Sequence, residues 1–429
     1  MMKHYDSYKD SGIEWIGEIP SHWEVKPIKY LFYYTKGSQG QLLTSSYVQD
    51  NPGDYPVYSG QTENNGVLGY YKNYEFDFFN SVIFTTTVGA KFMTTKCLKD
   101  KFSLSQNCLI MIPKNDNVIS TYHYYFLTID WKYRRELVPV IIQPSLRMED
   151  IDQFNTLLPP LSEQEQIVSY LDDKTTKIDE LIQKKLRKID LLKEYRTSLI
   201  NTVVTKGLNP DVPMKDSGIE WIGEIPSHWE VSKFKYHSEI ITGNTPSKTE
   251  DERYYTTKEK GFPWIKPSSL DRGFDYVYES EEYLTDLGKS YTRVIPIDSI
   301  MVCSIGNTLG KYGISGMELS TNQQINSVIC DGLTLIPRYC LFFINVLTVD
   351  LIKWTNYVTL PIFTKSDFEN TEVIVPPISE QEHIVSYLDE KTSQIDKTID
   401  IEKKKIELLK EYRQSLISNV VTGKIKVIE

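Results

Sequence analysis

The 429-residue sequence is poor in the residues that build metal sites and disulfide frameworks. Its five cysteines, Cys97, Cys108, Cys303, Cys330 and Cys340, form no C-x-x-C pair and no cluster with the six histidines at metal-ligand spacing. We therefore expect reduced cysteines in the core and no structural zinc. The sequence also lacks an N-terminal signal pattern and an apolar run of about 18 residues. Secretion and membrane spanning are not expected, and the expected location is the cytoplasm.

Basic charge is also scarce for a protein that would bind nucleic acid. Lysine and arginine number 48 against 58 aspartate and glutamate residues, which gives a net charge of −10. Taken alone, this balance counts against nucleic-acid binding. The charge is uneven, because residues 26–152 are close to neutral while residues 232–372 and the helical segments carry the acid. Any DNA-facing surface must therefore be a local patch.

Complete catalytic motifs are missing as well. Residues 306–311, GNTLGK, resemble a phosphate-binding loop, but they have one residue too few between the glycines, and Tyr312 follows where Ser or Thr should stand. Residues 51–55, NPGDY, lack the second proline of the amino-methyltransferase loop, and no Gly-rich loop for S-adenosylmethionine accompanies them. His22 and His228 have no nearby nucleophile or carboxylate in a shared pattern. The sequence therefore predicts no catalytic site.

What the sequence does contain is a long repeat without proline or glycine. Residues 161–204 carry apolar residues at heptad spacing, which predicts one long helix. Ser162 and Glu165 form a capping-box pattern after two prolines, and Gly207 marks the end. Residues 378–421 repeat the same text. The chain therefore supplies two long helices that can pair as an antiparallel coiled coil.

The apolar positions of the predicted seam agree between the two copies. The seam residues are Leu171, Ile178, Ile182, Ile189, Leu192 and Leu199 in the first copy and Leu388, Ile395, Ile399, Ile406, Leu409 and Leu416 in the second. Polar interruptions also match, for example Thr175 and Thr392, which argues against two unrelated amphipathic helices on separate cores. Lys185 corresponds to Glu402, and opposite charges favour pairing of one copy with the other over pairing of a copy with itself.

A second repeat opens each half of the chain. Residues 9–25, KDSGIEWIGEIPSHWEV, recur letter for letter at residues 215–231. Their Trp and Ile side chains are too apolar to lie in water and their Gly, Pro and Ser residues favour turns, so we expect a docking segment. The order of segment, variable region and helix, taken twice, predicts a pseudo-two-fold ring with neighbouring termini and a variable region at each end. From Leu171 to Val203 the seam would be roughly 50 Å long.

Two variable regions lie between the repeats, at residues 26–158 and 232–375. Short runs of Tyr, Phe, Ile, Val and Thr, such as SVIFTTTV at 81–88 and SIMVCSI at 299–305, are strand signals. Short helices are expected at 120–127 and 337–347, so the fold class is α+β. The expected domains are residues 1–158 (first docking segment and variable region), 159–207 (first long helix), 208–375 (second docking segment and variable region) and 376–429 (second long helix).

Both variable regions contain side chains suited to DNA. Lysine and threonine suit phosphates, while glutamine and asparagine can pair with adenine edges. The candidates are Lys91, Thr94, Thr95, Lys96, Lys99, Lys101, Ser105, Gln106, Asn107 and Arg147 in the first region and Asn244, Thr245, Ser247, Lys248, Lys266, Ser268, Asn307, Lys311, Asn322, Gln323, Gln324 and Lys365 in the second. For any single residue, plain solvated surface stays an open interpretation.

The tandem resembles the specificity subunit of type I restriction-modification enzymes over its whole length. The matching text is LPPLSEQE at 158–165, VPPISEQE at 375–382, the WIGEIP motifs, and GNTPS, PWIK and GNTLGK in the second region. The first region departs from this pattern, with TTVGAK at 86–91 and SQN at 105–107 instead.

The resemblance implies two α/β target recognition domains separated by an antiparallel coiled coil of two long conserved helices. Each domain would read one half of a bipartite double-stranded DNA site, and the helices would set the spacer. In that family the subunit catalyses nothing and binds no cofactor. It recruits two modification subunits, which bind S-adenosylmethionine and methylate adenine, and restriction subunits that use ATP and Mg²⁺. The alternatives are a coiled-coil scaffold whose β-rich lobes bind protein, and an enzyme with an unrecognised site.

Overall fold

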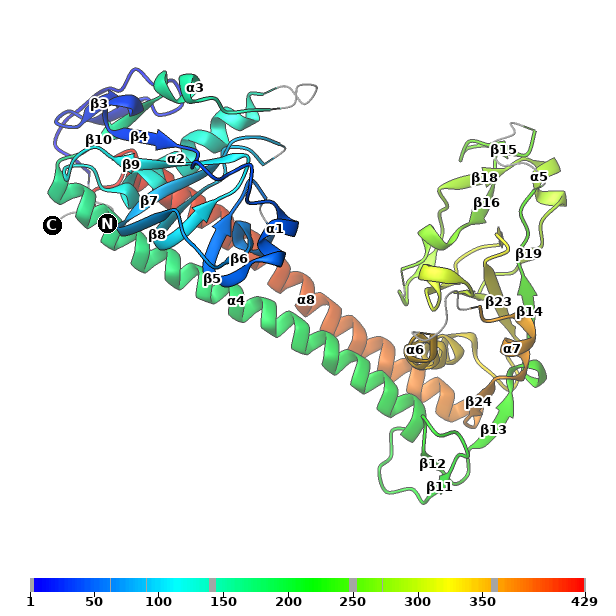
Figure 1. The fold of residues 1–429 in the computed structure, drawn as a ribbon. Helices are drawn as coiled ribbons and strands as arrows, with labels where there is room; N and C mark the ends of the chain where they lie inside the picture. Colours follow the sequence, from blue (N-terminus) through cyan, green and yellow to red (C-terminus); the bar gives the residue numbers. More distant parts are fainter. Residues whose placement is uncertain are drawn as a thin grey trace. The chain divides into compact units, whose positions relative to one another are not determined.

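The computed structural model describes residues 4–61, 63–89, 91–138, 144–246, 253–271, 273–355 and 362–427, with 349–355 as backbone only. The chain divides into two compact units. Unit 1 is Met1–Leu186 with Glu402–Glu429, and unit 2 is Arg187–Ile401. Each unit contains one α+β lobe and a part of each of two long helices (Figure 1).

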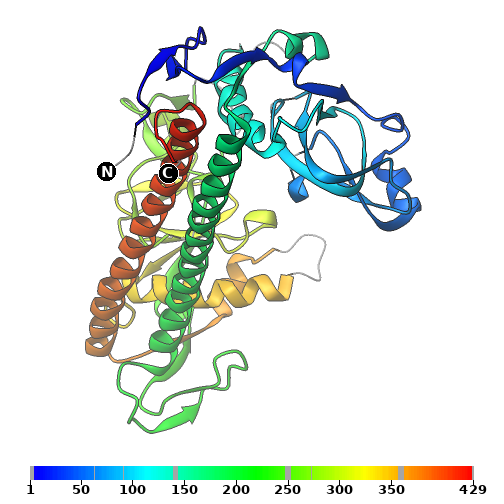
Figure 2. The ribbon, with the colours of Figure 1, turned by 90° about the vertical axis from the view of Figure 1, so that its left-hand side faces the viewer.

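The two long helices are α4, Leu161–Lys206, and α8, Ile378–Val421. In unit 1, Arg413 Nε donates to Asp179 Oδ1 at 2.9 Å and Lys185 Nζ donates to Glu402 Oε2 at 2.7 Å. In unit 1 the residue number falls along α8 as it rises along α4, so the helices are antiparallel, as predicted (Figure 2).

Burial along both helices follows the predicted seam. The buried members are Leu171, Ile178, Ile182, Ile189, Leu388, Ile395, Ile399, Ile406 and Leu416, while Leu192, Leu199 and Leu409 are half-buried. The capping-box prediction is wrong, because α4 begins one residue before Ser162. The carbonyl of Pro160 accepts from Glu163 N at 2.9 Å and from Gln164 N at 3.0 Å, so Pro160 is the N-cap. Ser162 lies exposed in the first turn.

Lobe 1 is a six-stranded sheet in the order β4-β9-β7-β8-β5-β6, antiparallel except for the parallel pair β5–β8. Its strands are β4 Phe32–Thr35, β5 Pro52–Tyr58, β6 Val67–Tyr71, β7 Phe76–Thr86, β8 Thr95–Leu104 and β9 Cys108–Pro113. Its helices are η1 Ile28–Tyr30, α1 Ser45–Asp50, η2 Glu63–Gly66, α2 Ser120–Glu136 and α3 Met148–Asp152. Helix α2 packs on β7 and β8.

Lobe 2 contains two five-stranded sheets, β14-β23-β20-β21-β17 and β15-β18-β16-β22-β19. The first has β14 Ser238–Thr242, β17 Tyr276–Val277, β20 Ile300–Cys303, β21 Tyr312–Ser315 and β23 Ile325–Cys330. The second has β15 Tyr255–Thr256, β16 Phe262–Ile265, β18 Glu282–Leu284, β19 Val294–Ile295 and β22 Leu319–Thr321. The helices are η3 Phe234–Tyr236, η4 Pro267–Ser269, α5 Asp286–Ser290, η5 Gly306–Thr308, α6 Pro337–Thr355 and α7 Lys365–Asn370.

Small two-stranded sheets join each lobe to its helices. They are β1 Tyr8–Asp10 with β2 Glu18–Pro20, β3 Glu24–Pro27 with β10 Asn155–Leu158, β11 Met214–Asp216 with β12 Glu224–Pro226, and β13 Glu230–Lys233 with β24 Glu372–Val375. Trp23 and Trp229, from the repeated docking segments, are fully buried. The predicted proximity of the termini is confirmed within unit 1, where Tyr8 Oη donates to Gly423 O at 3.4 Å.

Both predicted short helices exist but are longer than expected. Helix α2 continues nine residues beyond Leu127 to Glu136, and its Asp130–Arg134 ion pair, 2.7 Å between Oδ2 and Nε, spans one turn of that extension. Helix α6 reaches Thr355 rather than residue 347. The polar residues that follow Leu127 interrupt the apolar periodicity, and this interruption misplaced the predicted end.

Candidate nucleic-acid interface

Four loops of lobe 2 meet at one edge of its sheets. Strands β14 and β20 end there while β21 and β23 begin there, as the pairs Thr242 with Asn326 and Cys303 with Ile325 show. Strands β16 and β22 run parallel and end together, with Ile265 beside Thr321. The loops that follow β14, β16, β20 and β22 therefore share this edge, which we call the loop edge.

Backbone hydrogen bonds tie these loops to each other. Asn244 N donates to Thr321 O at 2.9 Å, which joins the loop after β14 to the end of β22. Asn322 N donates to Ile265 O at 3.0 Å, at the end of β16. Ser304 N donates to Gln324 O at 2.8 Å and joins the loop after β20 to the same turn. The described candidates of these four loops thus come together from four distant stretches of sequence.

The side chains at this edge differ in solvent exposure and in their hydrogen bonds. Asn307 and Gln323 are exposed, and Thr245 Oγ1 donates to Gln323 Oε1. Asn322 is buried and its Nδ2 donates to Gln324 Oε1 at 3.1 Å, so it shapes the turn instead of facing solvent. Lys311 is half-buried, and its Nζ donates to Pro267 O at 3.5 Å.

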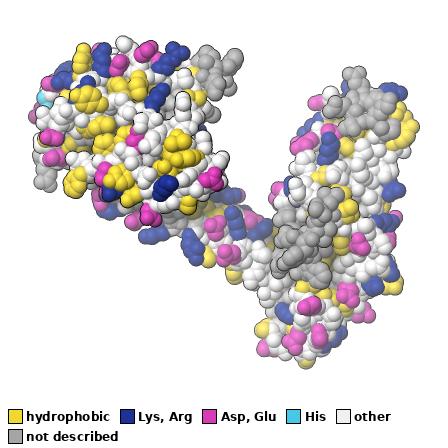
Figure 3. All heavy atoms as spheres, in the orientation of Figure 1, with side chains coloured by type: hydrophobic (Ala, Val, Ile, Leu, Met, Phe, Trp, Pro, Cys, Tyr) yellow, Lys and Arg dark blue, Asp and Glu magenta, His cyan; other side chains and the backbone are white. Residues whose placement is uncertain are grey.

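Carboxylates occupy part of the predicted basic surface of lobe 2. Lys266 Nζ is paired with Glu282 Oε1, and Ser268 Oγ donates to Glu281 Oε2 at 2.9 Å. Lys365, in the first turn of α7, lies 3.5 Å from Glu369 Oε1. The face visible in Figure 3 shows Lys and Arg interspersed with Asp and Glu on both units. Acidic side chains therefore offset part of the positive charge on this surface.

Lobe 1 repeats part of this hydrogen-bonded network at a constant offset of 217 residues. Thr87 N donates to Asn107 O at 2.8 Å, as Ser304 does to Gln324. Leu146 N donates to Thr87 O at 2.7 Å, matching Phe363 N to Ser304 O at 2.8 Å. The bridges Val88–Ser145 and Ile305–Ile362 also correspond. The first region departs in sequence from the family pattern, yet it shares these two hydrogen bonds and this bridge with the second region.

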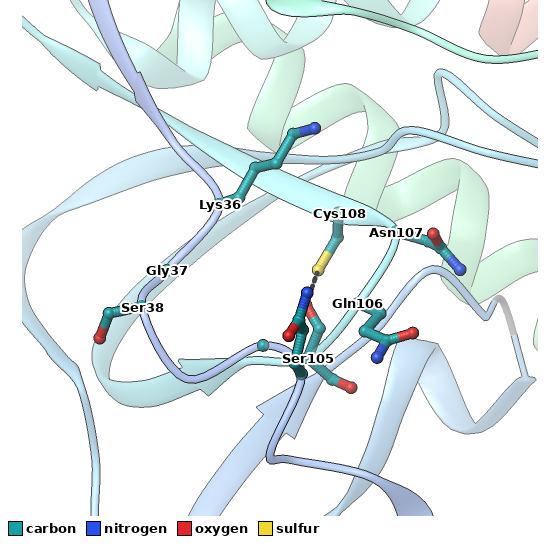
Figure 4. Close-up of a pocket in the computed structure, with 9 residues that line it drawn as sticks. Lys36, Gly37, Ser38, Ser105, Gln106, Asn107 and Cys108 are labelled. Carbon is teal, nitrogen blue, oxygen red and sulfur yellow. Dashed lines mark hydrogen bonds between the residues drawn. The ribbon is translucent and has the colours of Figure 1, made fainter.

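A cavity of about 430 Å³ opens at the loop edge of lobe 1 (Figure 4). It is lined by Lys36, Gly37, Ser38, Gly40, Gln41, Ser105, Gln106, Asn107 and Cys108. Gln106 and Asn107 are exposed predicted residues. Lys36, Ser38 and Gln41 were missed, because their loop follows β4 some 65 residues before the others in sequence. The polar stretch KGSQGQ at 36–41 directly after a strand was the available signal.

Three first-region candidates make contacts within the lobe: Ser105 is buried, and Thr95 and Lys96 are half-buried. Thr95 Oγ1 lies 3.2 Å from Thr128 Oγ1 of α2. Ser105 is buried and its Oγ donates to Leu43 O at 2.6 Å. The Nζ of Lys96 lies 4.4 Å from the centre of the Tyr58 ring, and burial lowers its pKa to about 8. Successive residues of a strand face opposite sides, so β8 cannot present Thr95 and Lys96 on one surface.

The remaining first-region candidates fall into two groups. Lys91, Gln106, Asn107 and Arg147 are exposed on loops of the edge. Thr94 belongs to the same turn but is half-buried, donating to Lys91 O at 2.7 Å. Two lysines lie elsewhere, on the middle of β8: Lys99 is exposed, and Lys101 has its Nζ 4.6 Å from the Tyr74 ring centre. Ser247 and Lys248 of the second region lie outside the described residues.

The two repeated histidines do have carboxylate partners, contrary to the sequence analysis. His22 Nε2 lies 2.7 Å from Glu163 Oε1, and Trp23 Nε1 donates to Glu163 Oε2 at 2.9 Å. His228 and Trp229 make the same two contacts with Glu380, at 2.7 and 2.9 Å. Each glutamate lies in the first turn of a long helix. The contact fastens the docking segment to the helix.

Neither a metal centre nor a membrane segment is present in the part of the chain that the structure describes. Among those residues, no three His, Cys, Asp or Glu side chains are grouped so that they could hold a metal ion. None of the described helices combines the length and the apolar character that crossing a bilayer requires.

Comparison with known sequences connects this architecture to one family. The family model described as type I restriction modification DNA specificity domain matches residues 20–191 and 226–411. The putative type I restriction enzyme MjaX specificity subunit of Methanocaldococcus jannaschii is 22% identical over 433 residues, covering 96% of each chain. A putative type I specificity subunit of Mycoplasma pneumoniae is 31% identical over 179 residues, which are 40% of this chain and 56% of that protein.

Solved structures share the fold. The HsdS subunit from Thermoanaerobacter tengcongensis superimposes with a TM-score of 0.52 at 14% identity, covering 95% of this chain and 98% of that one. A chain from a structural study of assembly and conformational transition in a type I R-M system gives a TM-score of 0.73 at 14% identity, with 95% and 99% covered. A general protein-binding scaffold is not favoured. The chain belongs to the type I restriction-modification DNA specificity family and is a non-catalytic specificity subunit.

Proposed function

We propose that each lobe reads one half of a bipartite double-stranded DNA site through its loop edge. The observation that carries this proposal is the common hydrogen-bonded backbone of the two edges, which holds different side chains. At the position of Asn107 in lobe 1, lobe 2 has Gln324, while exposed Gln106 and Gln323 occupy one shared position. Amide side chains can pair with adenine in the major groove. One scaffold with exchangeable side chains suits two half-sites of different sequence.

Phosphate contacts would come from the exposed basic residues beside these amides. Lys91 and Arg147 lie on loops of the lobe 1 edge, and Lys36 lines its cavity. At the lobe 2 edge, Lys266 is paired with Glu282 and Lys311 Nζ donates to Pro267 O. Because phosphate contacts supply much of DNA affinity, we expect weak binding by the isolated subunit and additional contacts from partner subunits. Tight binding of the isolated chain at physiological salt would contradict this expectation.

The long helices would set the distance between the half-sites. A seam of roughly 50 Å corresponds to on the order of one and a half turns of DNA at about 34 Å per turn. A bipartite site with a spacer of several base pairs is the expected consequence.

The helices also carry an apolar surface that is repeated. Leu191 and Tyr195 lie one turn apart on α4 and are 50% and 57% exposed, and Leu408 and Tyr412 on α8 are 63% and 55% exposed. All four belong to the text LLKEYR, which is identical in both copies. We propose that each Leu-Tyr pair docks one modification subunit, giving two per chain. S-adenosylmethionine, ATP and Mg²⁺ would be bound by modification and restriction partners, and the complex would work in the cytoplasm.

The DNA-reading proposal is tested by mapping methylated adenines in cells that express the chain with its modification partner. We expect a split motif, two short defined sequences separated by a fixed gap. Gln106→Ala should relax one position in one half, and Gln323→Ala should relax one position in the other half. Loss of a bidentate amide contact reduces discrimination by about 1–3 kcal/mol. An unchanged motif in both variants would contradict the proposal that the loop edges read the DNA sequence.

The docking proposal has its own test. Changing Leu408 and Tyr412 to serine should reduce the purified complex from two modification subunits to one, measured by native mass spectrometry. The matched change of Leu191 and Tyr195 should remove the other. Lys177→Ala, an exposed change on the same helix as Leu191, is the control and should leave two. Two bound subunits in both serine variants would contradict docking at these pairs.

A further inference from the structure

We infer that the Lys185–Glu402 ion pair decides which helices pair, favouring α4 with α8 and disfavouring either helix with a second copy of itself. The two atoms Nζ and Oε2 are 2.7 Å apart, and the side chains are only 18% and 5% exposed. Glu402 Oε1 also lies 3.6 Å from Lys405 Nζ of its own helix, and Lys185 is its partner on α4. Removing or reversing one member of a buried ion pair is strongly destabilising.

The internal repeat shows how this ion pair differs from the other ion pairs between α4 and α8. Residues 217 apart occupy equivalent positions, so Arg413–Asp179 and Arg196–Asp396 are the same contact made twice. If α4 paired with a second α4, Arg196 would meet Asp179 and the ion pair would survive. The apolar seam would survive as well, because Ile178, Ile182 and Ile189 correspond to identical residues of α8.

Lys185 and Glu402 are themselves equivalent, since 402 is 185 plus 217. Pairing of α4 with α4 would therefore place Lys185 against Lys185, and pairing of α8 with α8 would place Glu402 against Glu402. Two like charges buried side by side repel and lose solvation together. Among the ion pairs named above between α4 and α8, this position alone distinguishes the mixed pair from the two like pairs. The partner that the seam selects is the other half of the chain.

A nicked protein tests the selection directly. A protease site in the exposed stretch 208–211 allows the folded full-length chain to be cut into an amino-terminal and a carboxyl-terminal half that stay paired. After exchange in dilute denaturant and refolding, native mass spectrometry counts mixed and like pairs. In the wild-type seam, mixed pairs should exceed the random proportion by about tenfold or more. With Lys185→Leu and Glu402→Leu together, the proportions should approach roughly 1:2:1.

Either of two results would overturn the inference: abundant like pairs in the wild-type protein, or only mixed pairs in the double leucine variant. Mixing isotope-labelled and unlabelled halves verifies that exchange has occurred. If no exchange occurs, thermal unfolding of the uncut chain decides. Lys185→Glu and Glu402→Lys should each lower the Tm, and the combined swap should restore it. Lys174→Glu, at a 43% exposed position, is the control. Single variants that unfold like this control would reject the role of the pair.

Discussion

At the residue scale, the repeated text Ser-Glu-Gln-Glu gains a physical explanation. In each copy the glutamine side chain forms hydrogen bonds with backbone groups of residues that precede the long helix. Gln164 Nε2 donates to Pro159 O at 2.9 Å and its Oε1 accepts from Ile119 N at 3.0 Å. Gln381 does the same with Pro376 O and Ile336 N, both at 2.8 Å. Both glutamines are fully buried, so these bonds replace the solvation that the amide and the backbone lose.

The preceding glutamates support a prediction that compares the two repeats. Glu163 is 13% exposed and is bonded by Tyr5, His22 and Trp23, whereas Glu380 is 38% exposed and is bonded by His228 and Trp229. Glu163→Ala should lower the free energy of unfolding of unit 1 by about 1–3 kcal/mol, because buried donors lose a charged acceptor. Glu380→Ala should cost less. Chemical unfolding of both variants measures the difference, and equal costs would contradict the role of burial.

His123 makes unit 1 sensitive to acid. It is completely buried, and burial lowers its pKa to about 3 from an ordinary value near 6.5. The folded state therefore keeps it neutral, while the unfolded state binds a proton as the pH falls below about 6.5. Stability is lost in that direction, by about 2 kcal/mol at pH 5. At the equivalent position, unit 2 has Cys340.

The substitution His123→Cys, which copies the second repeat, should remove this part of the acid sensitivity. Chemical unfolding at pH 7.5 and pH 5 measures it, and the difference between the two pH values is the readout. Any loss of packing lowers stability at both pH values and cancels in that difference. The same difference in wild type and variant would show that His123 is not responsible.

At the element scale, a glycine with positive φ lies within two residues after the end of each long helix. Gly207 has φ +78° and Gly423 has φ +73°, a conformation that costs a residue with Cβ about 1–2 kcal/mol. A Cβ on Gly207 would lie 3.1 Å from Trp229 Cζ2, whereas a Cβ on Gly423 would overlap the ring of Pro20. Gly423→Ala should therefore destabilise more than Gly207→Ala. Denaturant unfolding with both variants side by side checks the order, which the reverse ranking would refute.

Elements with a strong local pattern could be predicted from the sequence. Heptad spacing gave the limits of α4 within two residues and those of α8 without error, and it placed Lys185 opposite Glu402. The orientation of side chains on strands could not be predicted. Lys96 and Lys99 belong to one basic run, yet one folds onto Tyr58 while the other is exposed. The two lysines are three residues apart on β8 and so face opposite sides, but the groups that cover each side come from other parts of the chain.

The residues of the loop edges were likewise predicted only in part from the sequence. In lobe 2, runs such as 306–311 and 322–324 were recognisable because their text resembles the family. In lobe 1, the equivalent positions were partly found, but Lys36 and Gln41 were not, because β4 and β9 come together only in the folded sheet. Sequence spacing carries no information on such a contact. The constant offset of 217 between the hydrogen bonds of the two lobes also became visible only from the structure.

At the scale of the whole molecule, each lobe enters and leaves its frame through adjacent strands. Glu24 of β3 pairs with Leu158 of β10 around lobe 1, and Glu230 of β13 pairs with Val375 of β24 around lobe 2. A segment whose two ends lie side by side can be replaced without moving the frame. Replacing residues 26–158 with another such region should therefore change one half of the methylated motif and leave the other half and the gap unchanged. Methylome sequencing reads all three, and altered bases in both halves would contradict independent lobes.

The division into units also fixes an order of events during synthesis. Unit 2 is one continuous stretch, residues 187–401, whereas unit 1 needs residues 402–429 to complete it. Tyr122, in helix α2 of lobe 1, donates its hydroxyl to Val421 O at 3.1 Å, in the last residue of α8. At about 5–20 residues per second, the ribosome spends roughly 10–40 seconds on the 215 residues in between (187 to 401). Lobe 1 is therefore translated first, but its unit is the last to be completed.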